Sequence, residues 1–88
     1  MLNIENEIRR RLETTFKCES LEIINESYKH QGHAGDNRSG QSHFRIRLTS
    51  PDFKNMSRIQ RHQAVNGLLQ DLFDQDLHAL ALSLKVSE

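Results

Sequence analysis

Hydrophobic residues along the chain fall into separate blocks with two different periods. In the first block, Ile4, Ile8, Leu12 and Phe16 recur every four residues, which is the spacing of one face of an α-helix. Asn3 stands directly before this block and has a side chain suited to a helix N-cap. The pattern therefore predicts an N-terminal helix with a single narrow apolar stripe.

Two alternating segments on either side of a polar loop predict a β-hairpin. Over residues 21–27, Leu21 and Ile23 alternate with polar residues, with Ile24 out of phase. Residues 43–49 alternate cleanly between apolar side chains and arginines. Between them, residues 30–42 are polar and hold three of the four glycines. A connection this long in so small a domain is usually functional or mobile. Ser50-Pro51-Asp52 is typical of a turn that ends the second strand.

The second half of the chain predicts a helical crossover and a final strand. A short helical turn is expected over residues 53–56, and Ser57 and Gln60 then have the spacing of a capping box. The helix that follows has an apolar face made of Val65, Leu68, Leu69, Leu72 and Phe73. Over residues 79–86, larger apolar residues alternate with Ala79, Ala81, Ser83 and Lys85. Because most of these are small, the pattern indicates a strand covered on both faces, or nearly so.

This order of elements predicts one α+β domain over residues 1–88. Its topology is α-β-β-α-α-β, with a three-stranded mixed sheet that carries its helices on one face. A chain of 88 residues has no room for a second domain. The last strand must pair with a strand of the hairpin after the helical crossover.

The composition narrows the class of protein. Twelve basic and twelve acidic residues give a formal net charge of zero, which argues against nucleic-acid binding through overall electrostatics but is compatible with a local basic patch. The longest unbroken apolar stretch runs only from Ala79 to Leu82, so no membrane span is expected. No signal-peptide pattern opens the chain. A single cysteine, Cys18, excludes an intramolecular disulfide, and a reducing, cytoplasmic location is expected.

Five histidines are the main candidates for chemistry, because histidine is the commonest metal ligand and the usual acid–base group near neutral pH. His30 and His33 lie on the polar loop. The periodicity places His62 within the apolar stripe of the long helix and favours a core histidine there. It places His43 outside the core, as a surface residue, and His78 at the start of the last strand, half-buried. Spacing alone favours these structural roles.

No catalytic constellation is evident, and the chain is not expected to be an enzyme. The serines and the cysteine stand without the sequence context of an activated nucleophile. Gly32-His33-Ala34-Gly35 matches a Gly-x-x-Gly pattern, but it lies between two strands and not at the start of a helix. The remaining charged cluster is a set of arginines, which usually forms a solvated face: Arg45, Arg47, Arg58 and Arg61.

Three short stretches together make the chain similar to the BolA family. They are Glu26-Ser27-Tyr28-Lys29-His30, Ser42-His43-Phe44, and Arg61-His62 followed by His78-Ala79-Leu80-Ala81-Leu82. Their order and separations resemble that family over almost the whole chain. The resemblance implies a fold similar to a class II KH domain, whose order of elements agrees with the periodicity.

The resemblance also implies a non-enzymatic protein that pairs with a monothiol glutaredoxin. The two proteins would share a bridging 2Fe–2S cluster, in iron–sulfur cluster assembly or trafficking or in iron-linked regulation. A glutaredoxin thiolate and a glutathione thiolate would hold one side of the cluster, and two imidazoles of this chain the other. The implied ligands are His30 and His78, with His33 as an alternative to His30. The cluster would exist only in the complex, and the free protein is expected to be a monomer without a cofactor.

Two other hypotheses stay open. The first is a DNA-binding transcriptional regulator of stress response and cell morphology, which would contact DNA through Arg58, Arg61 and His62. Gln63 replaces the second arginine of an Arg-His-Arg motif and so removes one charge from that surface. The second is a zinc or iron site within one chain, formed by His30, His33 and His78, which requires all three side chains on one ion.

Overall fold

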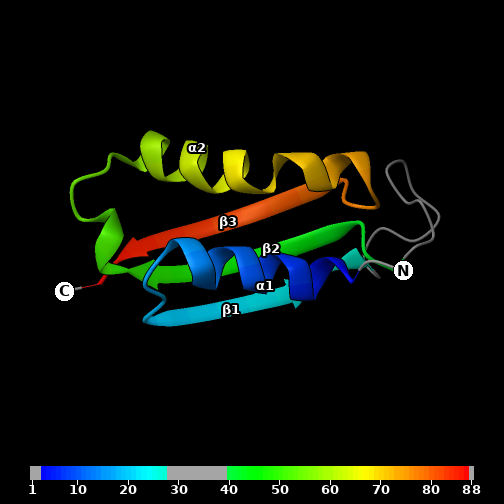
Figure 1. Cartoon of the computed structure of the whole chain (residues 1–88), viewed down its shortest axis with the longest axis horizontal. Coiled ribbons are helices and arrows are strands. Elements are labelled where there is room, and N and C mark those ends of the chain that lie inside the picture. Colours follow the sequence, from blue (N-terminus) through cyan, green and yellow to red (C-terminus); the bar gives the residue numbers. More distant parts are fainter. Residues whose placement is uncertain (1–2, 28–39, 88) are drawn as a thin grey trace.

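The computed structural model of the protein describes residues 3–27 and 40–87, and Figure 1 shows the arrangement of its elements. They follow one another as α1 (Ile4–Thr15), β1 (Ser20–Asn25), β2 (His43–Ser50), the 3-10 turn η2 (Pro51–Phe53), α2 (Arg58–Leu69), the 3-10 segment η3 (Gln70–Asp74) and β3 (Ala79–Val86). This order confirms the predicted α-β-β-α-α-β topology. The closer comparison with class II KH domains stays a prediction.

Both main helices begin at the caps that the sequence predicts. The Asn6 N–H donates a hydrogen bond of 2.9 Å to the Asn3 side chain at the start of α1. At the start of α2, the Gln60 N–H donates to Ser57 Oγ and the Ser57 N–H donates to Gln60 Oε1, which completes the capping box. These contacts satisfy N–H groups that have no partner within a helix, so local side chains decide where each helix starts.

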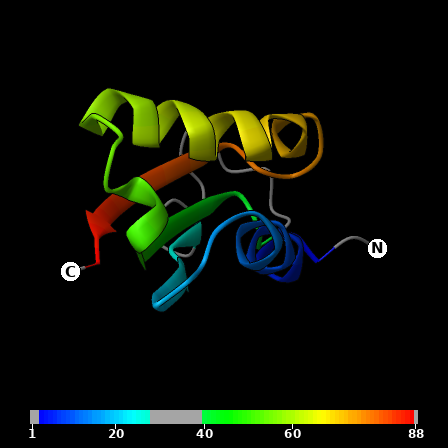
Figure 2. The same ribbon diagram turned by 60° about the vertical axis from the view of Figure 1, so that its left-hand side comes forward.

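The three strands form a mixed sheet in the order β1-β2-β3. β1 and β2 are antiparallel, with Ile23 opposite Ile46, and β2 and β3 are parallel, with Ile46 opposite Leu82. Both α1 and α2 lie on the same face of this sheet (Figures 1 and 2). Between helices and sheet lies a core of buried apolar side chains: Ile4, Ile8, Leu12, Ile23, Phe44, Ile46, Leu48, Phe53, Val65, Leu69, Leu72, Leu77 and Leu84.

The last strand differs from the prediction that it is covered on both faces. β3 lies at an edge of the sheet and is half-buried along most of its length. Its small residues have another reason: Ala81 lies opposite Arg45 and Ser83 opposite Arg47 on the face without helices. Small side chains leave room for the long arginine side chains of the neighbouring strand, and no second layer is needed to explain them.

The crossover also differs in detail from the sequence pattern. The helical turn expected over residues 53–56 lies at Pro51–Phe53, where Ser50 Oγ accepts a hydrogen bond from the Asp52 N–H. Proline favours the first position of such a turn because its φ angle is already fixed. The long helix keeps α geometry only to Leu69 and continues as η3, which leaves Phe73 half-buried. No helix in residues 3–27 and 40–87 has the length and apolar composition to cross a bilayer.

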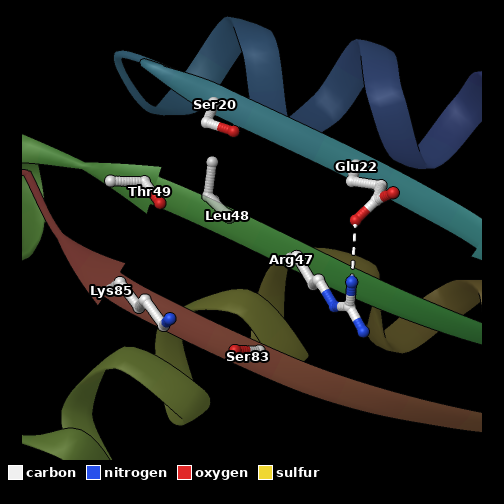
Figure 3. Close-up of a pocket in the computed structure, with 7 residues that line it drawn as sticks. All are labelled: Ser20, Glu22, Arg47, Leu48, Thr49, Ser83 and Lys85. Atoms are coloured by element: carbon white, nitrogen blue, oxygen red, sulfur yellow. Dashed lines mark hydrogen bonds and ion pairs between the residues drawn. The ribbon is translucent and has the colours of Figure 1, made fainter.

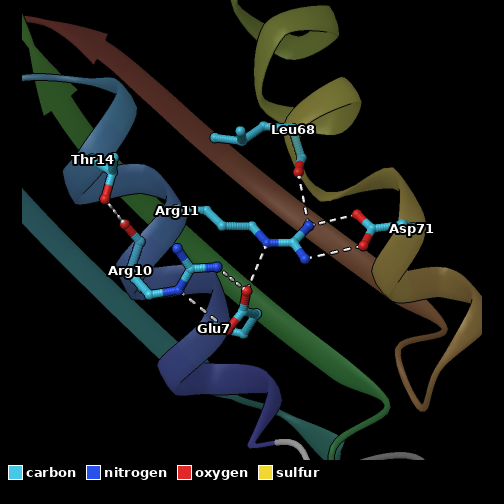
Figure 4. A network of polar contacts seen from close by, with 6 residues as sticks. All are labelled: Glu7, Arg10, Arg11, Thr14, Leu68 and Asp71. Atoms are coloured by element: carbon cyan, nitrogen blue, oxygen red, sulfur yellow. Dashed lines mark hydrogen bonds and ion pairs between the residues drawn. The ribbon is translucent and has the colours of Figure 1, made fainter.

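An arginine on α1 fastens that helix to the end of α2 (Figure 4). The half-buried Arg11 side chain donates hydrogen bonds to Glu7 Oε1 at 3.0 Å, to the Leu68 carbonyl oxygen at 3.1 Å and to Asp71 Oδ2 at 3.0 Å. Its hydrogen bond lowers the pKa of the Asp71 carboxyl, and hydrogen bonds from Arg10 and Arg11 lower the pKa of Glu7. These contacts fix how the two helices lie on the sheet.

The Arg11 contacts predict how stability depends on pH. A carboxyl whose pKa is lower in the folded than in the unfolded protein stabilises the fold above its unfolded pKa, and this contribution is lost as the pH falls through the folded pKa. Arg11→Met removes the shared partner of Glu7 and Asp71. The free energy of unfolding of Arg11→Met is therefore expected to lie below that of the wild type at pH 7 and to approach it at pH 3. Denaturant titrations of the wild type and the variant between pH 3 and pH 7 measure these free energies. Arg9→Met on the same helix is the control, and an equal deficit for Arg11→Met at every pH would contradict the prediction.

Candidate functional site

Two histidines lie side by side where β2 and β3 begin. Because these strands are parallel, their first residues meet at one end of the sheet, and His43 is the register partner of Ala79. The ring centroids of His43 and His78 are 5.3 Å apart, with an angle of 46° between the ring planes. The fold thus brings together two imidazoles that stand far apart in the sequence.

Two buried serines hold the backbone around these rings. Ser27 Oγ accepts hydrogen bonds from the Ser42 N–H at 2.9 Å and from the His43 N–H at 3.1 Å. The Ser42 carbonyl oxygen accepts from the His78 N–H at 2.7 Å and from the Ala79 N–H at 3.0 Å. Ser27 is 5% exposed and Ser42 is not exposed at all. We call these two residues the serine frame, since they tie the ends of β1, β2 and β3 together.

Asn25 holds Ser27 and Gly40 close to each other. Its Oδ1 accepts from the Ser27 N–H at 2.9 Å, and its Nδ2 donates to the Gly40 carbonyl oxygen at 2.7 Å. Gly40 has a φ of 74°, a conformation that glycine adopts without strain. Ser27 and Gly40 therefore both lie at the histidine end of the sheet. His30 and His33 lie outside the described residues.

His43 is buried, so the prediction of a surface position is wrong. It is only 8% exposed, and its Nδ1 lies 2.7 Å from Ser42 Oγ. Strand alternation correctly places its side chain on the face away from Phe44, but alternation says nothing of what lies over that face. The ring of His78 lies against it, because the parallel register brings the start of β3 beside the start of β2.

The positions of His78 and His62 also differ from the predictions. His78 is exposed and not half-buried, because β3 begins one residue later at Ala79. Its imidazole is thus accessible to a partner, as the resemblance requires. His62 is half-buried and not a core residue. The buried positions of α2, Val65 and Leu69, lie further along the helix, where it packs closely on the sheet.

The predicted arginine cluster (Arg45, Arg47, Arg58 and Arg61) is not one continuous basic patch. Arg45 Nε contacts Glu26 Oε2 at 3.2 Å, and Arg47 Nη1 contacts Glu22 Oε1 at 3.1 Å. Arg61 is half-buried and donates hydrogen bonds to the carbonyl oxygens of Met56 and Leu84. Arg58, at the start of α2, is exposed. Of the proposed nucleic-acid contacts, therefore, Arg58 is the arginine with an accessible side chain.

The face of the sheet without helices carries an open hollow of mixed polarity (Figure 3). Its volume is about 430 Å³, and both ends of the Glu22–Arg47 ion pair lie in it. The lining residues are Ser20, Glu22, Arg47, Leu48, Thr49, Ser83 and Lys85. This set holds two cations, one carboxylate and three hydroxyls, and it contains none of the histidines.

Cys18 is a poor candidate for chemistry. Burial raises the pKa of its thiol, and Glu13 and Asp52 raise it further, so the reactive thiolate is disfavoured. Among residues 3–27 and 40–87 no three histidine, cysteine or acidic side chains converge as metal ligands would. Two of the three histidines of the single-chain metal hypothesis lie outside those ranges, so that hypothesis stays a prediction.

Comparison with known proteins gives consistent results over nearly the full chain. The family model described as "BolA-like protein" matches residues 12–88. The UV-induced protein uvi31 of Schizosaccharomyces pombe is 39% identical over 82 residues, which cover 90% of this chain and 80% of that protein. The DNA-binding transcriptional regulator BolA of Haemophilus influenzae is 37% identical over 87 residues, which cover 99% of this chain and 81% of that protein.

Solved structures with the same fold cover the same range. BolA1 from Arabidopsis thaliana superimposes with a TM-score of 0.85 at 32% sequence identity. The match covers 98% of this chain and 94% of the BolA1 chain. The BolA domain of SufE1 from the same plant gives a TM-score of 0.82 at 33% identity and covers 98% and 95%. The arrangement of helices and sheet is thus shared with proteins that differ at most sequence positions.

Proposed function

This chain belongs to the BolA-like family, and on that basis we propose that it acts without catalysis, as the partner of a monothiol glutaredoxin. The two proteins share a bridging 2Fe–2S cluster, which is cargo or a signal in iron–sulfur assembly, trafficking or iron-linked regulation. The chain does this in the reducing environment of the cytoplasm. His78 and one histidine of the segment 28–39, His30 or His33, supply its ligands.

The exposed imidazole of His78 is the observation that carries this proposal. Its backbone N–H is bonded to the buried Ser42 carbonyl oxygen, so the residue extends from a fixed point of the sheet. Residues 28–39, which include His30 and His33, connect Ser27 to Gly40 along the chain. Asn25 hydrogen-bonds to both Ser27 and Gly40. The two residues that flank this segment therefore lie at the end of the sheet from which His78 extends.

Histidine ligands give such a shared cluster a definite chemistry. A neutral imidazole in place of a thiolate removes negative charge from the cluster and raises its reduction potential. Each imidazole must also be deprotonated to bind iron, so assembly is expected to weaken toward acidic pH. The thiolates of glutaredoxin and glutathione would complete the coordination, and the chain by itself needs to supply only half of it.

Reconstitution of the complex tests the proposal directly. The chain, a monothiol glutaredoxin, glutathione, iron and sulfide are combined without oxygen, and visible circular dichroism is recorded together with the mass of the complex. The matched control is glutaredoxin with the same components but without this chain. A new spectrum and a one-to-one heterodimer are expected. A spectrum identical to that of the glutaredoxin homodimer would contradict the proposal.

DNA binding is the second candidate function, and a specific observation favours it. Relatives from Haemophilus influenzae and Vibrio cholerae carry the name DNA-binding transcriptional regulator BolA. In this chain, Arg58 and Lys54 are exposed near the start of α2. The start of α2 lies at the end of the sheet where β3 finishes, opposite the end where β2 and β3 begin (Figure 1). Arg61 donates hydrogen bonds to the carbonyl oxygens of Met56 and Leu84 and is half-buried. Because its charge is held there, this surface is only weakly basic.

The two candidate functions use opposite ends of the molecule and can be separated by mutation. Binding to duplex DNA is measured at two salt concentrations, because each phosphate contact adds about 0.9 to the slope of log affinity against log salt. If DNA binding is the function, Arg58→Ala weakens it and His78→Ala does not. If His78→Ala weakens the glutaredoxin complex and Arg58→Ala does not, the first proposal is supported.

A further inference from the structure

We propose that His43 is a positioning residue for His78. Its buried ring holds the exposed imidazole of His78 in the orientation from which it donates a nitrogen to a metal. This inference rests on the function proposed above, and it adds a residue that makes no contact with the cluster itself. Three features of the histidine end of the sheet support it: a fixed ring, a fixed backbone and a contact between two rings.

The ring of His43 is held in place by contacts that do not involve His78. Its Nδ1 lies 2.7 Å from Ser42 Oγ, and Ser42 is fully buried. Its backbone N–H donates to Ser27 Oγ at 3.1 Å, so main chain and side chain are both bonded to the serine frame. With only 8% of the residue exposed, the ring has little space for other rotamers. His43 therefore presents a rigid surface to its neighbour.

The backbone of His78 is fixed by the same frame, but its exposed side chain is not. The Ser42 carbonyl oxygen accepts from both the His78 N–H and the Ala79 N–H, which sets the direction of the Cα–Cβ bond. An exposed histidine with a fixed backbone still has several staggered χ1 rotamers. Another contact is needed to select one of them.

The ring of His43 supplies that contact. A centroid separation of 5.3 Å and an interplanar angle of 46° lie within the range of tilted aromatic pairs. Rotation of His78 about χ1 would move its ring off this surface and forfeit the contact. A ligand already held in its bound rotamer loses less conformational entropy on binding, which raises its affinity for the metal.

The first test measures the side chain of His78 in the isolated chain. Three-bond couplings in NMR report its χ1 rotamer in the wild type, in His43→Ala and in His43→Phe. One dominant rotamer is expected in the wild type and averaged couplings in His43→Ala. His43→Phe keeps an aromatic ring and is expected to retain the wild-type couplings. His62→Ala, which removes a half-buried histidine of α2, is the control. Unchanged couplings in His43→Ala, or averaged couplings in the wild type, would overturn the proposal.

The second test measures the complex with glutaredoxin. Release of one side chain is expected to weaken the affinity of His43→Ala for cluster-loaded glutaredoxin about three- to tenfold, with recovery in His43→Phe. If both variants lose the complex while His78 keeps one rotamer, His43 is itself a ligand and the positioning role is wrong. If the wild type forms no complex, the proposed function fails, but the NMR couplings still decide the geometry.

A second variant covers the case in which His43→Ala does not fold. Ser42→Ala keeps both histidines and removes only the hydroxyl that fixes His43 Nδ1. Partial averaging of the His78 couplings is expected, with the same direction of change in affinity as in His43→Ala. Wild-type couplings in a folded Ser42→Ala protein would show that the bond to Ser42 does not fix the pair.

Discussion

Replacing His78 by alanine is expected to abolish the cluster-bridged complex with a monothiol glutaredoxin and to leave the fold intact. The side chain is exposed, and its backbone N–H still donates to the Ser42 carbonyl oxygen in the variant. Removal of a residue that hydrogen-bonds to a metal ligand costs about 10- to 100-fold in metal affinity, so loss of the ligand itself is expected to cost more. Visible circular dichroism and the mass of the reconstituted complex measure the loss.

The control for this variant is His62→Ala, which removes another histidine from a different part of the surface. His62 is half-buried on α2 and belongs to neither β2 nor β3. It is expected to keep the spectrum of the heterocomplex. For His78→Ala, the free energy of unfolding is expected to stay within about 0.5 kcal/mol of the wild type, as for most exposed positions. A heterocomplex with wild-type affinity in His78→Ala would remove this residue from the site.

Replacing Phe53 by alanine is expected to lower the free energy of unfolding by about 3–5 kcal/mol, the usual cost of truncating a buried phenylalanine. Phe53 is 0% exposed, and its ring centroid lies 5.1 Å from that of Phe16 in a tilted contact. The pair joins the end of α1 to the turn after β2. A loss of this size is a large part of the total stability of a small domain, which is about 5–15 kcal/mol. Denaturant titration measures it, together with a lower melting temperature.

The matched control for Phe53 is the exposed apolar residue Ile59. Its side chain on the first turn of α2 is 69% exposed, so truncation removes little buried area. Ile59→Ala is expected to change the free energy of unfolding by less than about 0.5 kcal/mol. A loss below 1 kcal/mol in Phe53→Ala, or a similar loss in both variants, would show that the core does not depend on Phe53.

Local sequence determined the elements of the fold and where they begin. Asn3 and Ser57 cap the two helices because a side-chain oxygen within a few residues satisfies the first free N–H groups. The alternation in β2 determined its inner face, with Phe44, Ile46 and Leu48 buried. These features depend on neighbours in the sequence, so the sequence is enough to predict them. The α+β topology followed from their order.

The candidate site was predicted only in part. The exposed position of His78 agrees with the ligand role that the resemblance implies, and His30 and His33 lie outside the described residues. The role of His43 was missed, since alternation gave it a surface position. A usable signal was present in Ser27, the last residue of the first predicted strand, and in Ser42, which directly precedes the second. Without the pairing of the strands, however, neither serine has a predictable partner.

The sequence by itself thus determined which residues form helices and strands, because these depend on spacing and on caps within a few residues. Only the tertiary structure decided that β3 is an edge strand and that His43 is buried against His78. Both follow from the parallel pairing of β2 with β3, which joins residues far apart in the chain. Such pairing is selected by the packing of the whole core, and no local pattern contains it. The serine frame exists for the same reason, since it needs the ends of three strands in one place.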